Sequence, residues 1–228
     1  GRPSMTTRAS KCQRTKEDYG RQCEVRMKGG ASSFFEVRHV EMKSDGGEEV
    51  PWATQIRRSP EEDWTFIQRV SAAYSLMPHQ VLVERLNESV TQGFGAGGSI
   101  SVDFGSKAAT QAGMLAIIDH PNFPQVNVAT IGQEDDVVRF QLIAFNSYDK
   151  SRALKVALGA VRFVCTNGMF FPSYMFAELK FVHYRQHDWT GLHEQLKDML
   201  EHAAPRCKEL WLAMKRKVLT DDDRKEFR

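Results

Sequence analysis

The chain has 228 residues, 41% of them hydrophobic, which is enough for one large domain or two small ones around a sizeable core. Its 31 Lys and Arg residues almost balance 29 Asp and Glu residues, so the net charge of +2 gives no chain-wide argument for a polyanion-binding protein. The charge is uneven, because residues 1–28 hold eight basic and three acidic side chains and residues 205–228 hold eight and five. The two ends are therefore basic and the body between them is acidic.

The N-terminal residues and the cysteines indicate an intracellular protein. We expect Gly1 to Ser4 to be an expression scar, and the residues after Met5 contain no apolar stretch of signal-peptide type. The cysteines are Cys12, Cys23, Cys165 and Cys207. Because they form no Cys-x-x-Cys pair, we expect free thiols instead of a disulfide framework or a zinc site. The expected location is the host cytoplasm, with no membrane contact and no cofactor.

The first third of the chain combines a polar arm with a hairpin. Residues 1–33 are basic and almost free of large apolar side chains, which predicts a flexible arm. Residues 34–40 predict a strand, and Ser-Asp-Gly-Gly at 44–47 supplies the turn of a hairpin. Ser-Pro-Glu-Glu at 59–62 is typical of a helix start, so a helix is expected over 59–70.

The middle of the chain alternates between helix and strand patterns. Leu82, Leu86 and Val90 recur at helical spacing and predict a helix over 79–90, which the glycines at 93–98 end. Short β-rich stretches then predict strands over 100–104, 114–119, 126–131 and 137–145.

The last third is predicted to be mostly helical. Residues 151–165 are almost continuously apolar and predict a buried helix that ends before Asn167-Gly168. A strand is expected over 178–184, and a long helix over 188–218 that Pro205 should kink.

Together these elements predict an α+β fold, an antiparallel sheet of four or five strands packed on helices, with a long kinked C-terminal helix. We expect a basic flexible arm at 1–33, an α+β core at 34–187, and a C-terminal helical segment and tail at 188–228.

One stripe of the helix expected at 151–165 carries the main functional hypothesis. Arg152, Lys155, Gly159 and Arg162 follow each other at spacings of 3, 4 and 3, which lines up three cations on one helix face. Such a stripe suits a nucleic-acid backbone, where each phosphate contact releases counterions. An ordinary solvated face is the alternative interpretation of the same spacing.

Further nucleic-acid contacts are expected from one aromatic residue and from the arm. Tyr174 lies beside Ser173 and Pro172, which suggests an exposed loop where its ring can stack on a base. The arm residues expected to assist are Arg14, Lys16, Arg21, Arg26 and Lys28.

Two other patterns favour different chemistry. The Gly-x-Gly-x-x-Gly at 93–98 matches a dinucleotide fingerprint, but the expected order of helix, glycines and strand is the reverse of that motif, so a turn is the better interpretation. Glu178-x-Lys180, with Asp119 or Asp149 as a second carboxylate, is the residue set of a metal-dependent nuclease. Alternating charges on a half-exposed strand explain the same residues without chemistry.

Three segments resemble an uncharacterised phage and plasmid protein family, domain of unknown function nine-three-two. They are Asn-Ser-Tyr-Asp at 146–149, residues 160–169, and Phe-Val-His at 181–183. The resemblance spans residues 65–228 and is sharp over 140–185. It implies an origin in a mobile element, beside replication, recombination and anti-defence genes, and implies no activity.

The expected order of elements over 80–170 also resembles single-strand annealing recombination proteins. In that superfamily a sheet backed by a helix assembles into rings that hold DNA along a groove, so the resemblance implies an oligomer. The leading hypothesis is therefore a non-catalytic phage or plasmid protein that binds single-stranded nucleic acid in recombination or replication. One form of this hypothesis adds strand annealing. The alternatives are an effector that binds a host protein and a metal-dependent nuclease.

Overall fold

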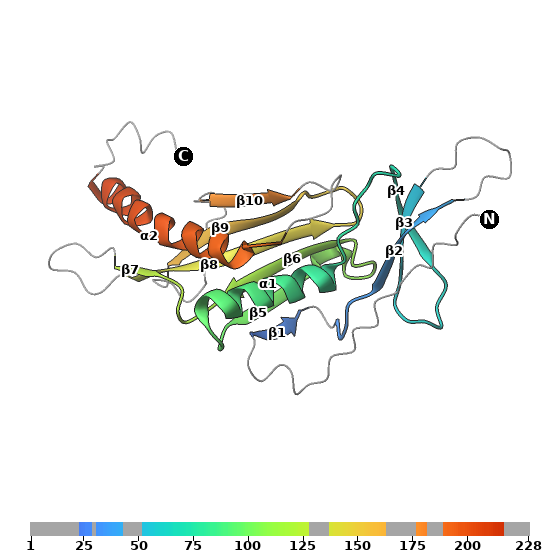
Figure 1. Ribbon diagram of the computed structural model, residues 1–228, viewed down its shortest axis with the longest axis horizontal. Helices are drawn as coiled ribbons and strands as arrows, with labels where there is room; N and C mark the ends of the chain where they lie inside the picture. Colours follow the sequence, from blue (N-terminus) through green and yellow to red (C-terminus); the bar gives the residue numbers. More distant parts are fainter. Residues whose placement is uncertain are drawn as a thin grey trace, which may run out of the picture.

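Two β-sheets and two long helices make up the described chain, which in this computed structural model comprises residues 23–28, 31–42, 52–127, 137–162, 177–181 and 189–216. The larger sheet has seven strands and the smaller has three. Both helices lie on one side of the larger sheet, and the smaller sheet stands at one end of it (Figure 1). The fold is α+β, as predicted, with strands dominating.

The seven-stranded sheet is mixed and wider than the four or five strands predicted. Its strand order is β1 (Glu24–Met27), β5 (Ser99–Asp103), β6 (Gly113–Asp119), β8 (Val137–Ser147), β9 (Leu154–Arg162) and β10 (Ala177–Phe181), and β7 (Gln125–Asn127) pairs with β8. All neighbouring strands are antiparallel except β1 and β5, which are parallel. The strands predicted over 100–145 are confirmed where the chain is described.

The helices α1 (His79–Phe94) and α2 (Leu192–Arg216) bury their apolar faces against alternate residues of this sheet. On α1 the buried apolar side chains are Leu82, Val83, Leu86 and Val90, at the spacing that predicted the helix. Pro205 lies inside α2, and the bend expected there stays a prediction. Within the described ranges, no helix is both long enough and apolar enough to cross a membrane.

The smaller sheet is an antiparallel meander of β2 (Glu36–Glu41), β3 (Trp52–Arg57) and β4 (Thr65–Val70). It is hydrogen-bonded to the larger sheet at the end of β8, where the Thr54 hydroxyl donates to the Tyr148 carbonyl at 3.0 Å. Near this point Gln111, at a φ of 48°, accepts from the Phe35 N–H and donates to the Ser33 carbonyl.

Part of the predicted flexible arm is an ordered edge strand. Cys23 is fully buried, and its N–H and carbonyl both bond to the side-chain amide of Asn87 on α1, at 2.8 and 3.1 Å. Burial raises the pKa of the Cys23 thiol. Residues 24–27 therefore form a strand of the sheet within the segment where the sequence predicts an arm.

Two predicted helices are strands in the structure. Residues 154–162 form the strand β9. The sequence suggested a helix because a strand that is buried on both faces has the same continuous apolar run as a buried helix. The helix expected over 59–70 is replaced by a turn and β4. A turn hydrogen bond from the Glu62 N–H to the Ser59 carbonyl does form, but the Thr-Phe-Ile-Gln-Arg-Val segment that follows has strand propensity.

Candidate functional site

The candidate site lies on the face of the seven-stranded sheet opposite the two helices. The registers align Asp103, Leu115, Phe145, Lys155 and Lys180 in one row across β5, β6, β8, β9 and β10. Side chains opposite each other in neighbouring strands are about 5 Å apart at Cβ and interact directly. We call the face that carries this row the open face because neither described helix covers it, although Ile143 and Ala157 on the same face are buried. The row has a carboxylate at one end, apolar side chains in the middle and two cations at the other end.

Two cations flank the half-buried ring of Phe145 at the centre of the row. The Arg152 guanidinium carbon lies 5.7 Å from the ring centroid, and the Lys155 Nζ lies 5.1 Å from it. Both distances are within the range of a cation–π contact, about 6 Å. Arg152 is exposed and has no acidic partner among the described residues. The site therefore combines an aromatic face with positive charge.

Lys155 is also bound to a carboxylate. Its Nζ lies 3.5 Å from Glu178 Oε2, and Lys180 lies 2.6 Å from Glu178 Oε1. The hydrogen bond from Lys180 and the charges of both lysines lower the pKa of Glu178. Glu178 is therefore ionised at neutral pH and offsets part of the positive charge of the row.

The turn between β8 and β9 positions Arg152. The Ser147 hydroxyl accepts from the Arg152 N–H at 3.0 Å and donates to the Arg152 carbonyl at 2.9 Å. Asp149 accepts from the Ser151 N–H at 3.0 Å and from Lys107 Nζ at 2.5 Å, and Lys150 has a φ of 60°. Burial alone would raise the pKa of Asp149, but the hydrogen bonds from Lys107 and Ser151 lower it. The turn is thus fixed to the 3-10 helix η2 (Gly105–Lys107) by an ion pair.

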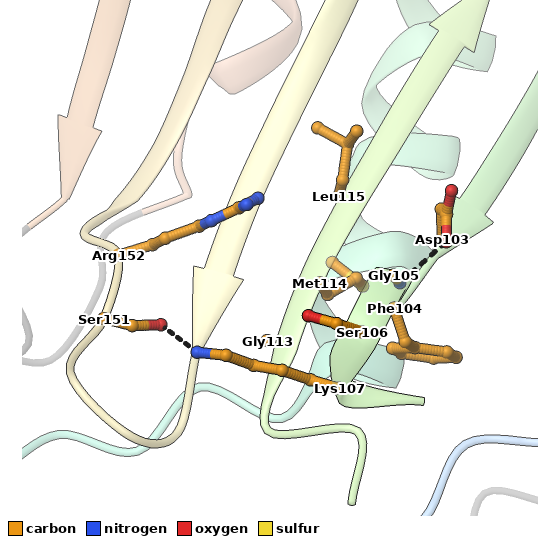
Figure 2. Close-up of a pocket in the computed structure, with 10 residues that line it drawn as sticks. All are labelled: Asp103, Phe104, Gly105, Ser106, Lys107, Gly113, Met114, Leu115, Ser151 and Arg152. Carbon is orange, nitrogen blue, oxygen red and sulfur yellow. Dashed lines mark hydrogen bonds between the residues drawn. The ribbon is translucent and has the colours of Figure 1, made fainter. Parts of the chain in front are cut away.

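A pocket of about 330 Å³ lies between this turn and η2. Figure 2 shows Lys107 and Arg152 on its two sides, with Leu115 above and the side-chain-free Gly113 beside the Lys107 stem. A Cβ at Gly113 would lie 3.2 Å from Lys107 Cδ, so the glycine leaves room for the lysine to lie across the sheet. Lys107 Nζ also donates to the Ser151 hydroxyl at 2.6 Å.

The start of the Asn-Ser-Tyr-Asp segment is buried behind this turn and forms a polar junction. Asn146 Nδ2 donates to the Met77 carbonyl at 2.7 Å and to His79 Nδ1 at 3.0 Å, while His79 Nε2 lies 2.8 Å from the Gln111 carbonyl. These partners assign the neutral Nε2–H tautomer to His79. The Tyr148 hydroxyl accepts from the His79 N–H at 2.7 Å, and the two rings stack with centroids 3.9 Å apart. Burial lowers the pKa of His79 to about 3, so this histidine is a neutral structural group.

The structure brings together only part of the predicted cation stripe. Arg152 and Lys155 lie beside the same ring, whereas Arg162 is the last residue of β9 and its side chain lies outside what the structure describes. Arg26 is on β1, where it pairs with Glu24 at 2.5 Å, and Lys28 follows that strand. The predicted residues Arg14, Lys16, Arg21 and Tyr174 lie outside the described residues.

Sequence reasoning missed Phe145 and Lys107. Phe145 ends the strand predicted over 137–145, and its alternation with buried Ala144 marked it as a residue of the other face. No sequence signal connected Lys107 with Asp149, because their contact depends on the packing of η2 against a turn 42 residues later.

The residues of the nuclease hypothesis are placed apart or engaged elsewhere. Glu178 binds two lysines, Asp149 binds Lys107, and Asp119 lies at the far end of β6. Within the described ranges, no group of three potential metal ligands occurs. The glycines at 93–98 join a helix to a strand, as expected for a turn.

The comparisons with known proteins identify a family and no activity. No curated protein and no solved structure matches the chain. A family model, described as a domain of unknown function (DUF932), matches residues 67–228, which include α1, β5 to β10, α2 and the whole of the pocket. The chain therefore belongs to the DUF932 family.

Proposed function

We propose that this protein binds single-stranded nucleic acid on the open face, as a non-catalytic oligomer that acts in recombination or replication of a phage or plasmid. The observation that carries the proposal is the Phe145 ring with Arg152 and Lys155 beside it on a sheet surface. An aromatic ring stacks on any unpaired base, and the two cations that lie over the Phe145 ring can move to the phosphates on either side of that base when the strand binds. The mobile-element origin and the oligomer rest on the sequence resemblances.

The balance of charge favours a single strand over a duplex. The row, the pocket lining and their ion-pair partners contain four described cations, Lys107, Arg152, Lys155 and Lys180, and three described carboxylates, Asp103, Asp149 and Glu178. Affinity for duplex DNA comes mainly from phosphate neutralisation, which a surplus of one charge supplies poorly. Stacking adds about 1 to 3 kcal/mol per base and requires bases that are not already paired.

Salt-dependent binding of a fluorescent single-stranded oligonucleotide tests the proposal. Arg152→Ala should reduce the slope of log K against log salt by about 0.7, the value for one lost phosphate contact on a single strand. Phe145→Leu keeps the apolar volume and should weaken binding by about 1 to 3 kcal/mol with an unchanged slope, because it removes only stacking.

The matched control is Arg85→Ala. Arg85 is an exposed arginine on α1, which lies on the other side of the sheet, and it forms an ion pair with Glu88 at 3.2 Å. This variant should bind like the parent chain. Equal slopes for Arg152→Ala and Arg85→Ala, or equal affinity for Phe145→Leu and the parent, would contradict the proposal.

A further inference from the structure

The pocket beside Arg152 has two chemically different ends. It is lined by Asp103, Phe104, Gly105, Ser106, Lys107, Gly113, Met114, Leu115, Ser151 and Arg152. In Figure 2 the Lys107 ammonium meets Ser151, the Arg152 guanidinium extends above them towards Leu115, and Asp103 lies across the pocket. The volume of about 330 Å³ is at the lower end of the range for small-molecule sites, ~300 to 1,000 Å³. The pocket therefore has room for one small polar ligand.

The cationic end suits a phosphate. Lys107 Nζ already donates to Asp149 and Ser151, and an ammonium has three N–H donors, so a third bond is possible without breaking those two. The Arg152 guanidinium, which lines the pocket on its other side, can donate two parallel bonds to a phosphate.

The acidic end suits a donor group and repels a second phosphate. Asp103 Oδ1 accepts from the Gly105 N–H at 2.7 Å, which fixes the orientation of the carboxylate. An ionised carboxylate only accepts hydrogen bonds, so it can pair with the exocyclic amino group of cytosine or adenine but not with the O4 acceptor of thymine. The charge of Asp103 therefore disfavours a second phosphate at this end.

We propose, resting on the function proposed above, that the pocket receives a single nucleotide turned out of the bound strand. Its phosphate lies between Lys107 and Arg152, and the amino group of its base donates to Asp103. Binding of the strand is then selective for cytosine over thymine at this one position.

The first test compares the affinities of oligodeoxycytidylate and oligothymidylate of equal length. The parent chain should prefer the cytosine strand, and Asp103→Asn should reduce the affinity ratio by about fivefold or more, because an amide can turn to donate to thymine O4. Asp119→Asn is the control, since Asp119 lies on the open face at the other end of β6 and the variant removes the same charge. Its ratio should equal that of the parent.

The second test uses the ¹³C-methyl NMR signal of Met114, a lining residue that is 1% exposed. Deoxycytidine monophosphate should shift this signal in the parent chain and not in Lys107→Gln, whereas inorganic phosphate at the same concentration should shift it less. Equal shifts with the nucleotide and with phosphate would overturn the nucleotide pocket in favour of a simple anion site.

The outcomes separate the two proposals. If Asp103→Asn leaves the ratio unchanged while Arg152→Ala still reduces the salt slope, the nucleotide pocket is wrong and strand binding on the open face stands. When deoxycytidine monophosphate shifts Met114 but no oligonucleotide binds, strand binding is wrong and the pocket remains as a mononucleotide site. Absence of both effects overturns both.

Discussion

Replacing Asn146 with alanine tests whether the buried junction behind the candidate site is structural. Asn146 is fully buried and donates to the Met77 carbonyl and to His79 Nδ1. Removing the amide leaves both acceptors without these bonds, and each unsatisfied buried group costs about 1 to 3 kcal/mol. We therefore expect Asn146→Ala to lower the free energy of unfolding by about 2 to 6 kcal/mol, a large part of the ~5 to 15 kcal/mol typical of a folded protein.

Urea unfolding followed by circular dichroism measures this loss as a lower midpoint at an unchanged slope. The control is Asn122→Ala, which removes one exposed hydrogen bond to the Phe94 carbonyl and should cost about 1 kcal/mol or less. At a temperature where Asn146→Ala is still folded, its salt slope for oligonucleotide binding should equal that of the parent. A loss no larger than that of Asn122→Ala would refute the structural role.

Two further predictions concern acid stability and tight packing at glycine. Burial lowers the pKa of His79 from its usual 6.5 to about 3. Between these two pH values the unfolded chain binds a proton at this histidine that the folded chain does not bind. The free energy of unfolding should therefore be highest above pH 6.5 and should fall as the pH drops towards 3. The urea midpoint of the parent should fall across this pH range towards that of His79→Gln, because the variant has no histidine to titrate at this position. At Gly98 a Cβ would lie 2.6 Å from both Cys23 Sγ and His120 Cδ2, so Gly98→Ala should destabilise the fold by about 1 to 3 kcal/mol in the same assay. Gly93 lies on α1 with its nearest contact at 3.6 Å, so Gly93→Ala should instead stabilise by about 0.5 to 1 kcal/mol, and equal signs for the two variants would contradict this packing argument.

The sequence predicted the elements whose patterns depend on only one buried face. Leu82, Leu86 and Val90 identified α1 because its other face is solvated, and the β-rich stretch over 137–145 identified β8. The pattern failed at β9, where Val156 and Leu158 face the helices while Ala157 and Gly159 are also buried on the opposite side. A segment that is buried on both faces shows no hydrophobic periodicity in its sequence. Its conformation therefore depends on pairing with the neighbouring strands, which the sequence pattern does not show.

The candidate site was predictable only in part for the same reason. Arg152 and Lys155 were singled out for a helical spacing that does not exist, and they meet because the turn before β9 and the strand itself place both next to Phe145. The pairing of Phe145 with Lys155 is a cross-strand register, and the ion pair of Lys107 with Asp149 is a tertiary contact. Neither follows from spacing along the chain.

The position of β1 has a consequence for the part of the chain that defines the family. The family match begins at residue 67, yet the strand that pairs with β5 comes from residues 24–27, and the Asn87 amide finds both its backbone partners at Cys23. A fragment cut at the family boundary would present the bare peptide groups of β5 to any strand in solution, including the same strand of another copy. Residues 24–27 thus cover the outer peptide groups of β5, and their detachment would replace an edge strand of four residues by one of five.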